Sequence, residues 1–158
     1  ITIPLDPTMT PMENAQRYFE KYNKQKRTFE ALSHLIDETK NEIDYLESVL
    51  ATGSTFYNQL AVQCQQVTEK YLKGYLDTHY FEEDVSDLLR KHNMKKIASR
   101  LNEIYPELNL DTIGLAYLTD FYFDARYPGD DFYTVTKSDF DKCLEIMYDT
   151  LNKLMTAL

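Results

Sequence analysis

Mostly apolar and aromatic residues recur at alternating four- and three-residue steps through the first third of this chain. They are Tyr18, Tyr22, Gln25, Phe29, Leu32, Ile36, Thr39, Ile43, Leu46 and Leu50. Such a heptad seam of more than four repeats is typical of a helix that packs lengthwise on other helices. Thr10, Pro11 and Glu13 supply a capped start, with Thr as N-cap and Glu closing a capping box. We therefore expect one helix over residues 11–50, about 60 Å long and longer than the later helices can cover.

The remaining sequence also predicts helices. Only four Gly and five Pro occur among 158 residues, which disfavours a turn-rich β architecture. Period and capping residues predict helices over about 55–79, 86–104 (with a break near His92-Asn93), 112–125 and 136–154. Asp111 is the expected cap of the fourth helix, and Thr136 with Asp139 caps the last. The expected fold class is thus all-α: an antiparallel up-down bundle of about five helices with an extended, coiled-coil-like first helix.

The apolar residues and the two cysteines predict which side chains are buried and in which cellular compartment the protein lies. The second helix is expected to bury a row of apolar residues with Cys64 as a small core residue; the row comprises Phe56, Leu60, Val67, Tyr71 and Tyr75. Cys64 and Cys143 lack metal-ligand spacing, and no apolar run reaches the length of a membrane span. We expect a cytoplasmic protein that does not enter the membrane, with no metal and no cofactor.

The charge of the chain limits its partners. A net charge of -9 excludes indiscriminate coating of nucleic acid, because phosphates would repel the chain at long range. Residues 90–100 nevertheless hold five of the 17 cationic residues. On a continuous helix Lys91 would align with Lys95, and His92 with Lys96 and Arg100. This segment is either a solvated helix face or a contact surface for phosphate or RNA.

A polar stripe crosses the predicted second helix. Gln66, Glu69, Lys70 and Lys73 have i, i+3, i+4 and i+7 spacing, so they share one face. The two lysines are suited to neutralise phosphates, or equally to pair with acidic residues of the last helix such as Asp141 and Glu145. A stripe of this kind inside an otherwise apolar segment needs polar partners.

Two segments carry a family resemblance: residues 61–73 (AVQCQQVTEKYLK) and residues 124–131 (DARYPGDD). Together they resemble the HEPN family over about residues 43–158. The resemblance implies a homodimer, often beside a minimal nucleotidyltransferase partner in a toxin–antitoxin or defence pair. Its ribonuclease members carry Arg, four to six residues, then His late in the bundle, and here no His follows Arg126. Enzymatic activity is therefore left open.

The candidate site residues follow from this resemblance and from the stripe. Arg126 and His92 are the candidates for catalysis in place of the missing motif. Arg126 is expected to bind a phosphate, or to form a bidentate ion pair with Glu69 that steadies its loop. The candidate ligand-binding residues are Gln66, Glu69, Lys70, Lys73, His92, Lys96, Arg126 and Tyr127.

The first fifty residues carry a second resemblance. The segments are residues 3–7 (IPLDP), 10–19 (TPMENAQRYF), 22–24 (YNK) and 42–47 (EIDYLE). They resemble NFACT (fibronectin-binding-protein-like) proteins where the N-terminal domain runs into its coiled coil, and such proteins act on stalled large ribosomal subunits. We thus expect residues 1–50 as an NFACT-like segment and 51–158 as a HEPN-like bundle. Gly53-Ser54 is a natural helix end or the junction of a chimera.

Three functions are compatible with these observations. The first is a HEPN-type module that binds a nucleotide or RNA. The second is a metal-independent RNase toxin. The third is a coiled-coil adaptor or a ribosome-associated NFACT-like fragment.

Overall fold

The computed structural model describes residues 3–79, 85–124 and 133–156, without the side chains of 28–29, 31–32, 35–36 and 122–124. These described residues form helices and no strand, which confirms the all-α class. The elements are α1 (Pro11–Ala51), α2 (Tyr57–His79), α3 (Ser86–Leu89), α4 (Met94–Ile104), the 3-10 helix η1 (Pro106–Leu108), α5 (Thr112–Asp124) and α6 (Lys137–Thr156).

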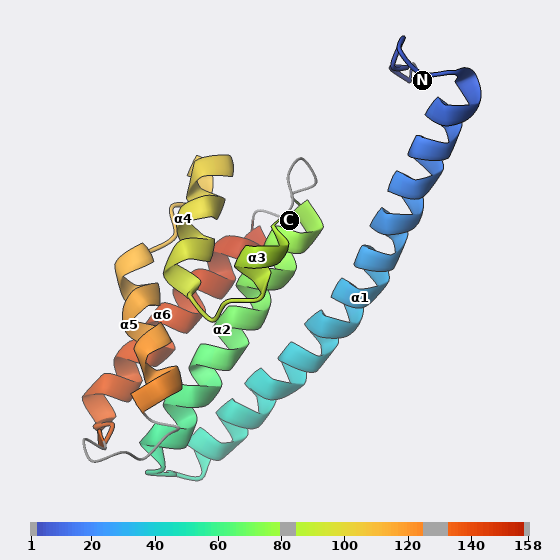
Figure 1. The fold of residues 1–158 in the computed structure, drawn as a ribbon. Helices are drawn as coiled ribbons and strands as arrows, with labels where there is room; N and C mark the ends of the chain where they lie inside the picture. Colours follow the sequence, from blue (N-terminus) through green and yellow to red (C-terminus); the bar gives the residue numbers. More distant parts are fainter. Residues whose placement is uncertain (1–2, 80–84, 125–132, 157–158) are drawn as a thin grey trace.

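Helix α2 is the centre of the bundle (Figure 1). It contacts α1, α4, α5 and α6, so its surface is covered on several sides. Its buried residues therefore include polar ones, Gln65, Thr68 and Glu69, besides apolar ones such as Leu72. The Thr68 hydroxyl donates to the carbonyl of Cys64 at 2.7 Å, which satisfies it within the helix.

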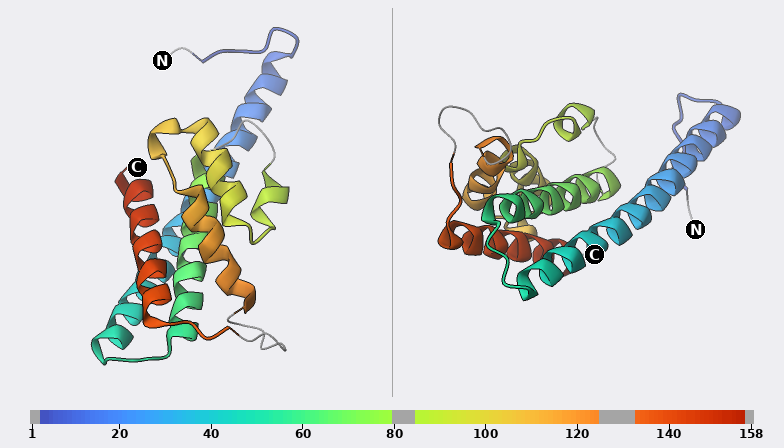
Figure 2. Two further views of the ribbon diagram at one scale, coloured as in Figure 1. Left: turned by 90° about the vertical axis from the view of Figure 1, so that its left-hand side faces the viewer. Right: turned by 90° about the horizontal axis from the view of Figure 1, so that it is seen from below.

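Helix α1 packs on the bundle only through its C-terminal part. Leu46 is fully buried, and Ile43, Val49 and Leu50 pack against the same core. Toward its N-terminus α1 diverges from the bundle, and Figures 1 and 2 show this from three directions. The expected long helix is confirmed, and so is the expectation that part of it lies beyond the other helices.

The helix starts are set by the predicted caps. Thr10 and Glu13 form a reciprocal capping box, with Thr10 N donating to Glu13 Oε2 at 2.7 Å. Asp111 Oδ1 accepts from the backbone of Gly114 at 3.0 Å, and Thr136 N donates to Asp139 Oδ2 at 2.9 Å. All three predicted caps are therefore confirmed.

Two expectations about the elements need correction. The helix expected over 86–104 is two helices, because the chain leaves helical geometry after α3 and Asn93 caps α4 by accepting from Lys96 N at 3.0 Å. The break lies where it was predicted, but it removes the alignment of Lys91 with Lys95 and of His92 with Lys96. Phe56 was expected in the core and is instead 71% exposed, because α2 begins at Tyr57 and leaves Phe56 just outside the helix.

A glycine ends the long helix. Gly53 has φ +73°, in the left-handed region that residues with a Cβ rarely adopt, and its N–H donates to the carbonyl of Leu50 at 2.9 Å. The chain can therefore reverse within a few residues and lay α2 against α1.

Candidate functional site

The first candidate site is the projecting part of α1. We call residues Ala15–Glu38 the arm. Every described residue of the arm is exposed except Asn23, which is half-buried. The next seam residue along the helix, Thr39, is 1% exposed. The arm is therefore a helix whose described side chains have solvent on all faces, a state that helices seldom keep without a partner.

The arm carries a dense group of positive charge. Its arm cluster consists of Arg17, Lys21, Lys24, Lys26 and Arg27, all exposed. Glu20 is the one acidic residue in the same eleven positions. Arg17 Nη1 lies 3.4 Å from Asp6 Oδ2, which is long for an ion pair. The arm cluster holds five cationic residues, as many as residues 90–100, so the count of charges along the sequence was a signal that could have identified it.

A folded hook holds the tip of the arm. Asn14 is 3% exposed, accepts from the backbone N–H of Asp6 at 2.8 Å and donates to the carbonyl of Asp6 at 3.0 Å. Tyr18 donates its hydroxyl to the carbonyl of Pro4. These contacts fold the N-terminal segment back on α1 and give the arm a defined end.

The second candidate site is a nearly buried carboxylate on α2. The side chain of Glu69 is 10% exposed. Its Oε1 lies 2.6 Å from Lys73 Nζ and 2.9 Å from His92 Nδ1, and its Oε2 accepts from Gln65 Nε2 at 2.6 Å. We call these four residues the Glu69 cluster. A buried carboxylate is stable only when it is paired in this way.

The structure divides the predicted stripe. Lys70 forms an ion pair with Glu42 of α1 rather than joining the Glu69 cluster. Of the two alternatives for the stripe lysines, pairing with Asp141 and Glu145 of the last helix is wrong, since Lys73 pairs with Glu69 at 2.6 Å and Lys70 with Glu42. Gln66 is half-buried on α2. The polar stripe therefore pairs with two elements: Lys70 with α1, and Glu69 with the α3–α4 connection.

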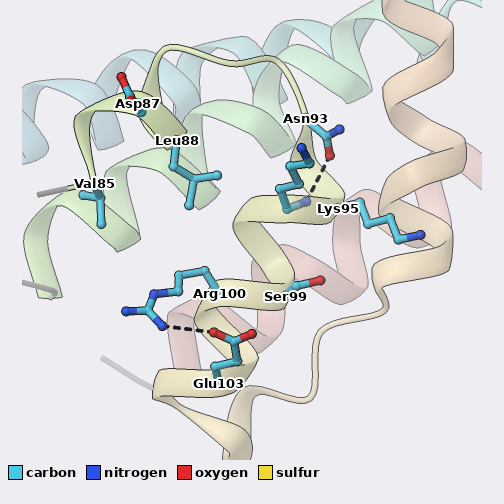
Figure 3. A pocket seen from close by; sticks show the side chains of 9 residues that line it. Val85, Asp87, Leu88, Asn93, Lys95, Ser99, Arg100 and Glu103 are labelled. Carbon is cyan, nitrogen blue, oxygen red and sulfur yellow. Dashed lines mark hydrogen bonds and ion pairs between the residues drawn. The ribbon is translucent and has the colours of Figure 1, made fainter. Parts of the chain in front are cut away.

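The third candidate site is an open groove between α3 and α4 (Figure 3). It has a volume of about 650 Å³, and the apolar residues Val85 and Leu88 line its α3 side. Lys95, Lys96 and Arg100 line it, together with acidic residues; Arg100 lies 3.0 Å from Glu103. Because His92 belongs to the connection that precedes α4, the Glu69 cluster and this α4 groove share one short segment of chain.

Other sequence candidates are placed as follows. Arg126 and Tyr127 lie outside the described residues, so the expected pairing of Arg126 with Glu69 is untested. Near that loop, the hydroxyls of Tyr117 and Tyr133 donate to Asp139 at 3.3 and 2.9 Å. Burial is the main cause that raises the pKa of Tyr117 to about 12, so it stays a neutral donor.

The cysteines give no nucleophile. Cys64 and Cys143 are fully buried free thiols. Burial raises the pKa of Cys143 to about 12 and that of Cys64 further, so neither is a thiolate near neutral pH.

Among the described residues no group of three His, Cys, Asp or Glu side chains is placed to hold a metal ion. Within the same residues, none of the helices combines the length and apolarity needed to cross a membrane.

These sites are suited to binding anions. The arm cluster and the α4 groove offer lysine and arginine donors to phosphates, and the Glu69 cluster fixes the orientation of His92 beside the groove.

Comparison with known proteins places the first half of the chain. Residues 1–78 match the model of the NFACT N-terminal and middle domains. A curated Rqc2 homolog RqcH from Streptococcus suis (strain 05ZYH33) is 40% identical over 84 residues, which cover 52% of this chain and 14% of the relative. The RqcH of Streptococcus pneumoniae (strain D39) is 48% identical over 63 residues, 40% of this chain and 11% of the relative. The RqcH of Bacillus subtilis (strain 168) is 44% identical over 50 residues, which cover 32% of this chain and 9% of the relative.

The chain thus spans a small part of the curated relatives it matches. No solved structure is found to match it. The family match covers the hook, the whole of α1 and nearly all of α2, so the NFACT-like part of the sequence analysis is supported.

Proposed function

We propose that this chain is an NFACT-like module that associates with the large ribosomal subunit through its arm. The observation that carries the proposal is the match of residues 1–78 to the NFACT N-terminal and middle domains, because this range holds the complete arm and the helix that anchors it. The matched relatives are named Rqc2 homologs.

The charge distribution supports RNA as the surface that the arm contacts. The chain as a whole has a net charge of -9, yet the arm cluster holds five exposed cationic residues and one acidic neighbour. A narrow helix that projects from its bundle can bring these charges to ribosomal phosphates while the acidic bundle stays at a distance.

The test is co-sedimentation with purified large ribosomal subunits. The variant Lys21→Glu/Lys24→Glu/Arg27→Glu reverses three exposed charges of the arm cluster. We expect the wild type to pellet with the subunits and this variant to remain in the supernatant. Raising the salt concentration weakens wild-type binding, and the slope of log affinity against log salt is reduced by up to about three in the variant.

The matched control reverses three exposed cations elsewhere. The variant Lys91→Glu/Lys95→Glu/Lys96→Glu changes the net charge by the same amount but alters the rim of the α4 groove. It should retain binding to the subunit. Loss of binding in the control and not in the arm variant contradicts the proposed role of the arm.

A second candidate function belongs to the bundle: a HEPN-like module that binds a nucleotide or RNA. The specific observation in its favour is the Glu69 cluster, which holds His92 at 2.9 Å from a nearly buried carboxylate next to the cationic α4 groove. Residues Lys96 and His92 of the predicted ligand-binding set lie at this place. In this function a partner nucleotidyltransferase supplies the catalytic carboxylates.

The two functions are separable with the same pair of variants. Fluorescence anisotropy with a labelled short RNA in EDTA measures binding, and gel analysis of the same samples measures cleavage. The second function predicts binding that is lost in the α4 variant and in His92→Ala but kept in the arm variant. Cleavage lost in both His92→Ala and Arg126→Ala would instead identify a ribonuclease.

A further inference from the structure

A small hollow beside α5 is lined by aromatic rings. Its volume is about 170 Å³, and the described residues that line it are Tyr117, Asp120, Phe121 and Tyr133, which we call the aromatic cage. The first three share one face of α5, since they have i, i+3 and i+4 spacing. The ring centroids of Tyr117 and Phe121 are 5.0 Å apart with the planes at 76°, and those of Phe121 and Tyr133 are 6.1 Å apart at 63°. Three rings at such steep angles are the walls of a box.

Hydrogen bonds hold two of these walls in place. The hydroxyls of Tyr117 and Tyr133 donate to Asp139 at 3.3 and 2.9 Å. The backbone N–H and the hydroxyl of Thr136 also donate to Asp139, at 2.9 and 2.6 Å. The rings are therefore oriented before any ligand binds, and both oxygens of the Asp139 carboxylate already have donors. A tyrosine that donates to a carboxylate keeps more electron density on its ring, which strengthens its attraction for a cation.

The charge around the cage favours a cation. Asp120 is exposed and has no ion pair with a described residue. The net charge of -9 attracts cations to the chain at long range. Lys142 Nζ lies 4.0 Å from the centroid of the Tyr117 ring, although Lys142 is not among the described residues that line the hollow. One ring of the cage is thus already in contact with an ammonium group of the chain itself.

Size and hydrogen bonding narrow the class of cation. The hollow of about 170 Å³ is smaller than the roughly 300 Å³ at which pockets for drug-sized ligands begin, so it fits a head group rather than a nucleotide. A primary ammonium brings three N–H donors that need acceptors. The cage offers ring faces and the Asp120 carboxylate, because Asp139 is already occupied. A quaternary ammonium has no N–H to satisfy, and its methyl groups pack on aromatic faces.

We propose that the aromatic cage binds a small molecule with a quaternary ammonium group, of the choline type. The three rings surround the methyl groups, and Asp120 balances the positive charge. The cage shares no residue with the arm or with the α4 groove, so this site is independent of the proposed function.

The first test is titration of the isotope-labelled full chain with choline, followed by NMR of the backbone amides. Two analogues separate the contributions: one has carbon in place of nitrogen and no charge, and ethanolamine has the charge but N–H groups in place of the methyls. We expect choline to bind at least about tenfold more tightly than either analogue. The proposal is overturned if choline does not bind at millimolar concentration, or if either analogue binds as tightly as choline does.

The second test removes one wall of the cage. Tyr133 is 45% exposed, and we expect Tyr133→Leu to raise the dissociation constant of choline at least about threefold. Tyr133→Phe keeps the ring and should retain most of the affinity. Tyr45→Leu is the matched control, because Tyr45 is 59% exposed on α1, and it should bind choline as the wild type does. An equal loss in Tyr133→Phe and Tyr133→Leu contradicts a role for the ring face.

A third variant tests the charge without altering a ring. Asp120→Asn changes one exposed carboxylate, so the fold is kept. We expect it to weaken choline binding about threefold and to leave the uncharged analogue unaffected. Choline binding that is unchanged in both Tyr133→Leu and Asp120→Asn places the ligand elsewhere on the chain and overturns the proposal.

Discussion

The two halves of α1 share one heptad seam but differ in what covers it. From Thr39 to Leu50 the seam meets α2 and the core, and Leu46 is fully buried. From Ala15 to Glu38 the same spacing continues, yet every described residue but half-buried Asn23 is exposed. The comparison teaches that periodicity fixes which residues share a face, while the partner decides whether that face is buried.

The largest expected effect is at the buried half of the seam. Leu46→Ala removes a side chain with no exposure and leaves a cavity, so we expect the free energy of unfolding to fall by about 2–5 kcal/mol. Urea unfolding followed by circular dichroism measures it.

The matched variant is Tyr22→Ala in the exposed half, where Tyr22 is 59% exposed. Its unfolding free energy should change by less than about 0.5 kcal/mol. Equal losses in the two variants would break the comparison, because they would mean that the arm also packs on the bundle.

An intermediate loss of stability is expected when the buried charge of Glu69 is removed. Glu69→Gln leaves Lys73 beside an amide and removes the charge that pairs with it, so we expect a loss of about 1–3 kcal/mol in the same assay. Glu30→Gln is the control, because Glu30 is exposed on the arm. If the two variants are equally stable, the Glu69 cluster does not contribute to folding.

The smallest expected effect concerns two capping boxes of the same design. Hydrogen bonds from Thr136 are the main cause that lowers the pKa of Asp139, and the backbone N–H of Thr10 is the main cause that lowers the pKa of Glu13. Asp139→Asn on the packed α6 should cost about 1 kcal/mol at neutral pH. Glu13→Gln in the first turn of α1 should leave the main unfolding transition unchanged, since this end of α1 contributes no residue to the hydrophobic core.

The pH dependence of the Asp139→Asn effect follows from the direction of the shift. The folded pKa is lowered, so the stabilisation by Asp139 is complete above the ordinary carboxyl pKa and is lost as the pH falls through the folded pKa. The stability difference between wild type and variant should therefore shrink below about pH 4. Thermal unfolding at stepwise lower pH measures it, and a difference that grows with acid contradicts the role of the carboxylate.

Local chemistry was predictable wherever neighbouring residues decide it. The Thr10, Asp111 and Thr136 caps and the break before Asn93 depend on a few adjacent side chains, and the structure agrees with each. The predicted burial of Phe56 was wrong because α2 begins at Tyr57 rather than at about residue 55, which leaves this ring outside the helix.

The pairings of charged residues were less predictable, because they join elements far apart in the sequence. Glu42 and Lys70 are 28 residues apart, and His92 and Glu69 are 23 apart. Nothing in the residue spacing selects these partners over Asp141 or Glu145. The choice depends on how α1 and the α3–α4 connection lie against α2.

The sequence by itself determined the all-α class, the length and start of α1, the caps and the NFACT-like character of the first half, because these depend on periodicity, on adjacent residues and on direct similarity. Only the tertiary structure decided that the seam is divided into a packed half and an exposed arm. The length of α1, 41 residues against 23 in α2, predicts only that some of it stays uncovered. Where the division falls depends on the angle at which α1 diverges from α2, and the packing of the bundle sets that angle. The cations at the far end of α1 are therefore carried beyond the acidic bundle.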